Sequence, residues 1–131
     1  MPFSIRLPAL FSLALAGLAL SACQSGREAS APNRAALPTM ERVALAANTC
    51  WFKSGDAAFK PYRLAPELNS FSGRPRILAV PRNSPESRPV LVVQAEGSPA
   101  RLDAFGPLMN GAEGERIKRD VLRWANGANG C

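Results

Sequence analysis

The stretch Val90-Leu91-Val92-Val93-Gln94-Ala95 decides the fold that we expect of this chain. Its β-branched run is long enough to form a central strand that is buried on both faces. The segment that follows, Glu96-Gly97-Ser98-Pro99, has the composition of a turn. The chain is therefore expected to build a sheet around this strand.

Further strands are predicted before and after the central one. Arg76 to Val80 is a short apolar strand ended by Pro81, and Arg101 to Phe105 alternates apolar with charged residues, as expected when one face meets water. Phe59 to Leu64 is a possible edge strand, because Pro61 lacks the amide donor that a central strand needs. We expect a small antiparallel sheet of three or four strands.

Two helices are predicted at the ends of this region. Thr39 is a suitable N-cap for the first, whose apolar residues then recur on one face at positions Met40, Val43, Ala44 and Ala47. The second runs from Gly114 to Gly127 and carries on one face Ile117, Val121, Trp124 and Ala125. On its outer face, Arg116 is expected to pair with Asp120 at i,i+4. The fold class is α+β, with an N-terminal and a C-terminal helix packed on the sheet.

The N-terminal residues have the pattern of a cleavable signal peptide. Met1 to Arg6 carries only a positive charge, and the uncharged run from Leu7 to Leu20 follows it. A membrane-spanning helix needs roughly 20 consecutive apolar residues, whereas this run is shorter and contains Pro8 and Gly17. We therefore expect a signal that is removed and not a permanent anchor.

The four residues Leu20-Ser21-Ala22-Cys23 match every position of the lipobox of bacterial lipoproteins, which the first two dozen residues resemble. The resemblance implies that residues 1–22 are cleaved off and that Cys23 carries a diacylglycerol and an acylated amine. One acyl chain binds a bilayer marginally, whereas two or more hold a protein stably. The alternative is an ordinary secretory signal that is cut near Ala22 and leaves an incidental cysteine.

Gln24 bears on the location of the anchored protein. In lipoproteins of enteric-type bacteria, an aspartate after the cysteine commonly retains the protein in the inner membrane, and Gln24 stands here instead. The resemblance therefore implies a protein anchored in the outer membrane and facing the periplasm, with the inner membrane as the alternative.

The rest of the chain divides into a tether and one domain. Residues 23–38 show no hydrophobic period, and their Pro, Ser and Ala content predicts a flexible tether that starts at the lipidated Cys23. About 15 such residues have an r.m.s. span on the order of 20 Å. Residues 39–131 suffice for a single small periplasmic domain but not for two cores.

Cys50 and Cys131 remain as an even pair once Cys23 is assigned to lipid. Because the signal directs the chain to an oxidising compartment, we expect them to form one disulfide. It would close a loop of about 80 residues, for which chain entropy gives roughly 4 to 5 kcal/mol. A free reactive thiol would lack an activating histidine, and a zinc site would lack imidazole ligands, because the chain contains no histidine.

Two functions from different classes follow. The first is a membrane-anchored periplasmic lipoprotein that acts as a structural or interaction module at the cell envelope and docks on an envelope protein through a sheet edge or loop. The alternative is a module that binds an anionic envelope ligand, such as a lipid phosphate or a peptidoglycan carboxylate, through an arginine cluster. The mature chain carries 15 Lys and Arg against 10 Asp and Glu, because Arg6 leaves with the signal.

Four arginines flank the two predicted central strands and are expected to converge on one sheet edge: Arg74, Arg76, Arg82 and Arg88. Arginine favours planar, bidentate contacts with phosphate or carboxylate. The competing interpretation is a solvated basic rim. Catalysis, metal ions and other cofactors are not expected, because no spacing links the carboxylates and hydroxyls into a recognised constellation. Nucleic acid is disfavoured by the compartment and by the lack of aromatic residues interleaved with basic ones.

Overall fold

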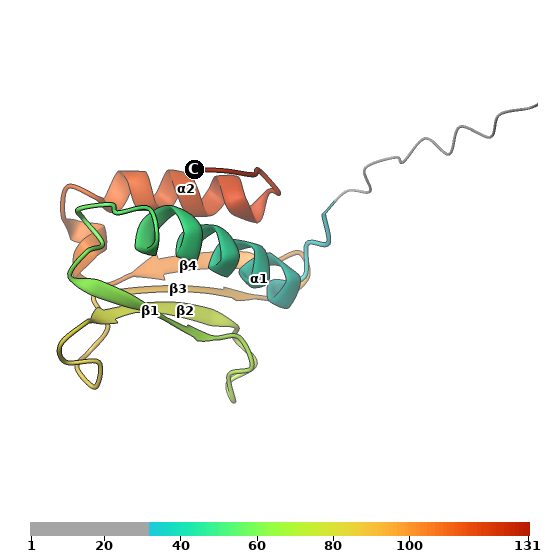
Figure 1. Ribbon diagram of the computed structural model, residues 1–131. Helices are drawn as coiled ribbons and strands as arrows, with labels where there is room; N and C mark the ends of the chain where they lie inside the picture. Colours follow the sequence, from blue (N-terminus) through green and yellow to red (C-terminus); the bar gives the residue numbers. More distant parts are fainter. Residues whose placement is uncertain (1–31) are drawn as a thin grey trace, which may run out of the picture.

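A computed structural model describes residues 32–131. The predicted signal peptide, the predicted acylation site Cys23 and the first part of the predicted tether lie outside the described residues. The α+β prediction is confirmed: one face of a four-stranded antiparallel sheet of order β1-β2-β3-β4 is covered by two helices (Figure 1). No helix within residues 32–131 has both the length and the apolar character that crossing a membrane requires.

The sheet is built from four short strands, β1 (Tyr62–Glu67), β2 (Arg76–Pro81), β3 (Leu91–Glu96) and β4 (Arg101–Phe105). The long apolar strand that the sequence places at the centre is β3, which pairs with β2 on one side and β4 on the other. In β4 the residues alternate between exposed and half-buried, as the charge alternation predicts.

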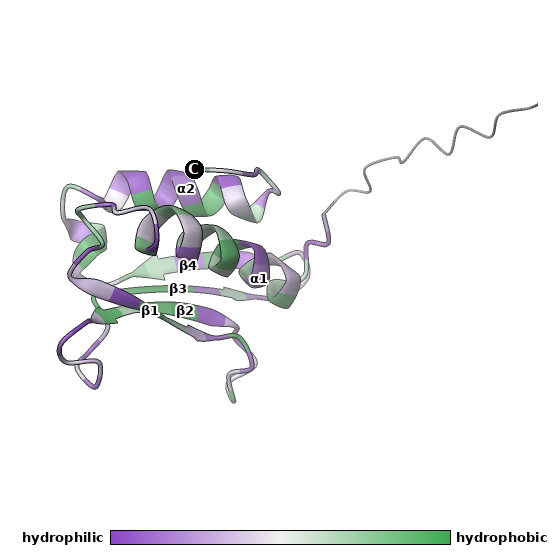
Figure 2. Ribbon diagram, in the orientation of Figure 1, coloured by the Kyte–Doolittle hydropathy of each residue, from purple (hydrophilic) through white to green (hydrophobic). Residues whose placement is uncertain are grey.

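Helix α1 spans Ala36–Ala47 and continues into a π-helical turn, Asn48–Phe52, and helix α2 spans Gly114–Ala125 after a short 3-10 turn, Pro107–Asn110. The two helices lie side by side on the same face of the sheet (Figure 1). Figure 2 shows that both turn apolar residues toward the sheet and polar ones outward. The core between the layers contains Met40, Val43, Ala47, Trp51, Phe59, Ile77, Leu91, Val93, Ile117, Val121 and Trp124.

Helix α1 begins three residues before the predicted start at Thr39. Ala35 is its N-cap residue, and Thr39 lies buried within the helix instead of capping it. Pro38 is tolerated because it falls in the first turn, where an amide has no partner inside the helix. The prediction of a tether that reaches Pro38 is therefore wrong for its last three residues, which are helical.

Strand β1 also differs from its prediction over Phe59 to Leu64, because it starts three residues later. Phe59 is drawn into the core, where its ring stacks on Trp51 with centroids 4.7 Å apart. The strand is at the edge of the sheet, as predicted, and it contains Pro66.

The predicted disulfide is present. Cys50 and Cys131, 81 residues apart in sequence, are bonded with their Cα atoms 5.3 Å apart. The indole Nε1 of Trp124 donates a hydrogen bond of 3.1 Å to the carbonyl of Gly130. The disulfide and this hydrogen bond together fasten the C-terminal segment to both helices.

Candidate functional site

The four arginines of the predicted anion site do not converge. Arg74 and Arg76 lie at the start of β2, whereas Arg82 follows its end and Arg88 lies in the β2–β3 loop. A strand of six residues is roughly 17 to 20 Å long, so the two pairs are at opposite ends of the sheet. The expectation of one basic edge is wrong because residues that flank the two ends of a single strand cannot meet.

Three of these arginines already have partners within the domain. Arg74 forms an ion pair with Glu96 at 2.9 Å, and Arg76 forms one with Glu67 at 2.5 Å. Arg82 donates from its guanidinium to the carbonyl of Tyr62 at 3.0 Å. The strand register explains the Arg76 pair, because Arg76 stands opposite Glu67 of β1.

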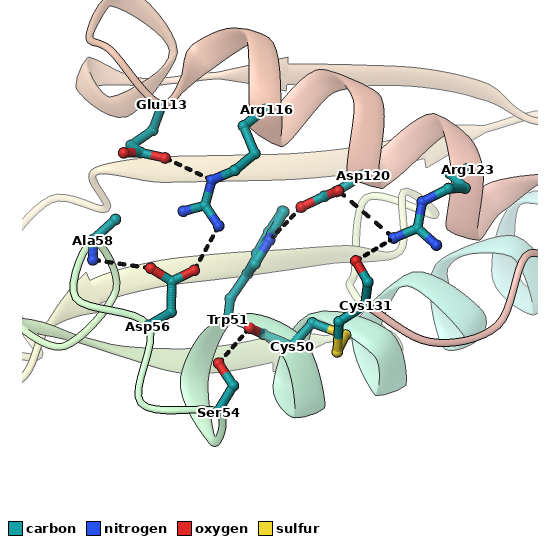
Figure 3. A network of polar contacts seen from close by, with 10 residues as sticks. All are labelled: Cys50, Trp51, Ser54, Asp56, Ala58, Glu113, Arg116, Asp120, Arg123 and Cys131. Carbon is teal, nitrogen blue, oxygen red and sulfur yellow. Dashed lines mark hydrogen bonds and ion pairs between the residues drawn. A yellow bond between two sulfur atoms is a disulfide. The ribbon is translucent and has the colours of Figure 1, made fainter.

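A polar network joins the segment after the π-helical turn to α2 (Figure 3). The guanidinium of Arg116 donates to Asp56 at 2.6 Å and to Glu113 at 2.7 Å, and it lies 5.5 Å from the centroid of the Phe59 ring. The predicted pair of Arg116 with Asp120 is wrong. Asp120 instead accepts a hydrogen bond from the buried indole Nε1 of Trp51.

The electrostatics of this network favour its charged form. The hydrogen bond from Arg116 holds the pKa of the Asp56 carboxyl below its ordinary value of 3.8; the amide of Ala58 adds to this effect, and desolvation opposes it. The same hydrogen bond raises the pKa of Arg116. An ionised carboxylate that is held by two donors serves as a structural tie. We therefore assign the network to the stability of the domain.

An apolar groove of about 540 Å³ runs between α1 and the edge strand β1. We call it the α1–β1 groove; it is lined by Glu41, Ala44, Leu45, Asn48, Leu64, Pro66 and Leu68. Leu45 is 72% exposed and lines the groove together with Leu64 and Leu68, so that three leucines contribute to one apolar surface. Glu41 is the one charged residue of the lining.

The sequence analysis missed this groove. Leu45 falls outside the predicted apolar face of α1, and that position on the wet side of an amphipathic helix is the signal that could have found it. The contribution of β1 could not be predicted, because it depends on how α1 crosses the sheet.

Comparisons with known proteins add no assignment: no protein family model, curated protein or solved structure matches this chain. Within residues 32–131, no three side chains of metal-binding type come together. The surfaces of the molecule are therefore the basis for assigning a function.

Proposed function

We propose that this protein is a lipid-anchored interaction module of the bacterial cell envelope, which docks an envelope protein in the α1–β1 groove. The observation that carries the proposal is the exposed hydrocarbon of the groove, above all Leu45, which is the most exposed of the large apolar residues on the two helices. Apolar grooves beside a helix are places where partner proteins insert apolar side chains. The lipobox at Cys23 supports the anchor and the periplasmic side of the outer membrane.

The groove favours one kind of partner. Leu45, Leu64 and Leu68 provide an apolar floor and walls, so the docking segment is apolar. Glu41 at the rim makes no ion pair with any of the described residues, and charge complementarity therefore places a Lys or Arg of the partner next to that segment. The partner is an envelope protein that presents an apolar segment with an adjacent cation.

The sequence of the edge strand β1 limits the ways in which a partner can dock. Pro66 has no amide proton, so β1 cannot offer a continuous row of donors to an added strand. The partner is therefore expected to place side chains in the groove and not to extend the sheet.

The proposal is tested by in-cell cross-linking of the full-length protein, followed by mass spectrometry of the cross-linked partners. Leu45→Glu is expected to remove the main partner, with at least a roughly tenfold loss of cross-linked product. The matched control is Leu122→Glu on α2, where the leucine is 46% exposed and lies beside β4, outside the groove. Equal recovery of the partner with Leu45→Glu and the wild-type chain would reject the groove.

The same sample tests the anchor. The N-terminal peptide of the mature protein is expected to begin at Cys23 and to carry the mass of a diacylglycerol and an amide-linked acyl chain. An unmodified Cys23 would overturn the anchor without affecting the groove, because the two are measured separately.

The alternative function, an anionic ligand held by all four predicted arginines, has less support. Arg74 and Arg76 are separated from Arg82 and Arg88 by the length of β2. A single small anion therefore cannot reach all four.

A further inference from the structure

One end of the domain carries the chain that leads back to Cys23. Asn33 accepts a hydrogen bond from Arg42 through its carbonyl, and the amide of Ala100 donates to the carbonyl of Arg34. The amide of Ala36 donates to Gly97 in the β3–β4 turn. These contacts fix the point where the chain leaves the domain, beside the β3–β4 turn.

The antiparallel topology brings the β1–β2 loop to the same end. Figure 1 shows this loop and the β3–β4 turn at the end of the sheet where α1 begins, with the β2–β3 loop at the opposite end. The tip of the β1–β2 loop is Phe71, whose side chain is fully exposed, and Arg74 follows it in the same loop. Phe71 is the most exposed large apolar residue in the part of the chain that the structure describes, so its ring is available to an external surface.

Besides Phe71, this end of the domain carries several arginines. Arg74 and Arg101 both form ion pairs with Glu96. Arg101 and Arg34 in turn line one hollow of about 350 Å³ that contains no carboxylate. The acidic groups that face these arginines are Glu96 and, on β4, Asp103. We call the set of Arg34, Phe71, Arg74 and Arg101 the tether-end surface.

The guanidinium groups of this surface can take a second partner. Arg74 contacts Glu96 through Nε, and its side chain remains 52% exposed. Arg101 contacts Glu96 through one terminal nitrogen, and its side chain remains 80% exposed. Because a guanidinium has five N–H donors, both arginines can donate to an external phosphate while they hold Glu96.

We propose that the tether-end surface is a membrane-contact surface for anionic phospholipid. Phe71 enters the boundary between headgroups and acyl chains, and the three arginines bind lipid phosphates. The inference rests on the proposed anchor at Cys23, which would hold this end near the bilayer. The nine residue-to-residue steps from Cys23 to Pro32 span about 30 Å at most when the chain is fully extended. The α1–β1 groove then faces sideways from the membrane, open to a partner in the periplasm.

The test uses the chain from Gln24 to Cys131, which lacks the acylated cysteine but keeps every core residue and the disulfide. Its binding to vesicles of equal parts phosphatidylethanolamine and phosphatidylglycerol is measured by co-sedimentation, with phosphatidylcholine vesicles as reference. We expect binding to the anionic vesicles that weakens as salt is added. Phe71→Ser is expected to lower the partition coefficient roughly tenfold, since it removes an aromatic side chain from the bilayer boundary.

A charge-matched pair of variants separates the surface from general attraction. Arg34→Gln with Arg74→Gln is expected to lower binding roughly 25-fold, at about one fivefold step for each cation at the membrane surface. Arg82→Gln with Arg88→Gln removes the same charge at the opposite end and is expected to retain most of the binding. Thermal unfolding of each variant reports whether the domain is intact.

Three outcomes would overturn the inference. They are an equal loss with both arginine pairs, unchanged binding by Phe71→Ser, and displacement from the vesicles by inorganic phosphate at constant ionic strength, which would indicate a simple anion site. The proposed anchor fails independently, because acylation of Cys23 is read from the mass of the full-length protein. Vesicle binding by the unacylated chain does not depend on that result.

Discussion

The indole Nε1 of Trp51 donates a hydrogen bond of 2.9 Å to Oδ2 of Asp120, a residue 69 positions away in the chain. Trp51 is buried between the rings of Phe59 and Trp124, so its one polar group has no access to bulk water. Asp120 also lies 3.7 Å from Arg123. The carboxylate thus joins the π-helical turn after α1 to α2, within the network of Figure 3.

Asp120→Ala is expected to destabilise the domain by about 1 to 3 kcal/mol, because it leaves the buried indole N–H without an acceptor. Asp120→Asn keeps an oxygen at the same place and should lose less. The free energy of unfolding in urea, measured for both variants, checks this order. Equal losses would show that the charge of Asp120, and not its role as acceptor, is what matters.

Asp56 gives the stability a defined dependence on acid. Its pKa in the folded state is below the ordinary value of 3.8, chiefly because of the hydrogen bond from Arg116. The stabilising contribution is complete above that ordinary value, and it is lost as the pH falls through the lower pKa of the folded state. Asp56→Asn is expected to abolish this part of the acid dependence. Urea midpoints measured between neutral pH and strong acid for both proteins test it; parallel curves would contradict the assignment.

The elements that could be predicted from the sequence are those with strong local patterns. In β3, β4 and α2, the spacing of apolar residues along the segment matches the face that is buried in the fold. The hydrophobic period alone is therefore enough to predict these three elements. The start of β1 could not be predicted, because the stacking of Phe59 on Trp51 is a tertiary contact that removes Phe59 from the strand.

The candidate surfaces depend on information that a linear pattern does not contain. Whether an arginine is free depends on the register that places Glu67 opposite Arg76, and on the turn that brings Glu96 to Arg101. Leu45 is visible in the sequence as a large apolar residue outside the apolar face of α1, but its groove partners on β1 follow only from the way α1 crosses the sheet. The sequence therefore shows which residue types are available, whereas the fold determines which of them lie together.

The disulfide is expected to contribute a large share of the stability. It closes a loop of 81 residues, for which the chain-entropy model gives about 4 to 5 kcal/mol. For a domain of this size that corresponds to a loss of roughly 15 to 30 °C in Tm. Calorimetry of Cys50→Ala with Cys131→Ala, beside the reduced wild-type chain, measures it. A shift of only a few degrees would mean that the unfolded chain is compact even without the bond.

Gly114, the first residue of α2, offers a test in which two effects have opposite signs. Helix propensity alone favours alanine over glycine by up to about 1 kcal/mol. A Cβ at this position, however, would overlap the carbonyl oxygen of Met109 and stand 2.9 Å from its carbon. Backbone cannot move aside as a flexible side chain can, so the overlap should dominate. We expect Gly114→Ala to destabilise the domain by about 1 to 3 kcal/mol.

Gly111→Ala is the matched control, three residues earlier in the same connection. The nearest atom to a Cβ there is the carbonyl oxygen of Leu108 at 3.8 Å, an ordinary contact. Its φ of −97° is one that alanine adopts freely, so the change should be neutral or slightly stabilising. Urea denaturation of the two variants gives the comparison. If Gly114→Ala were as stable as Gly111→Ala, the packing of the 3-10 turn against the start of α2 would have to be looser than the close approach to Met109 implies.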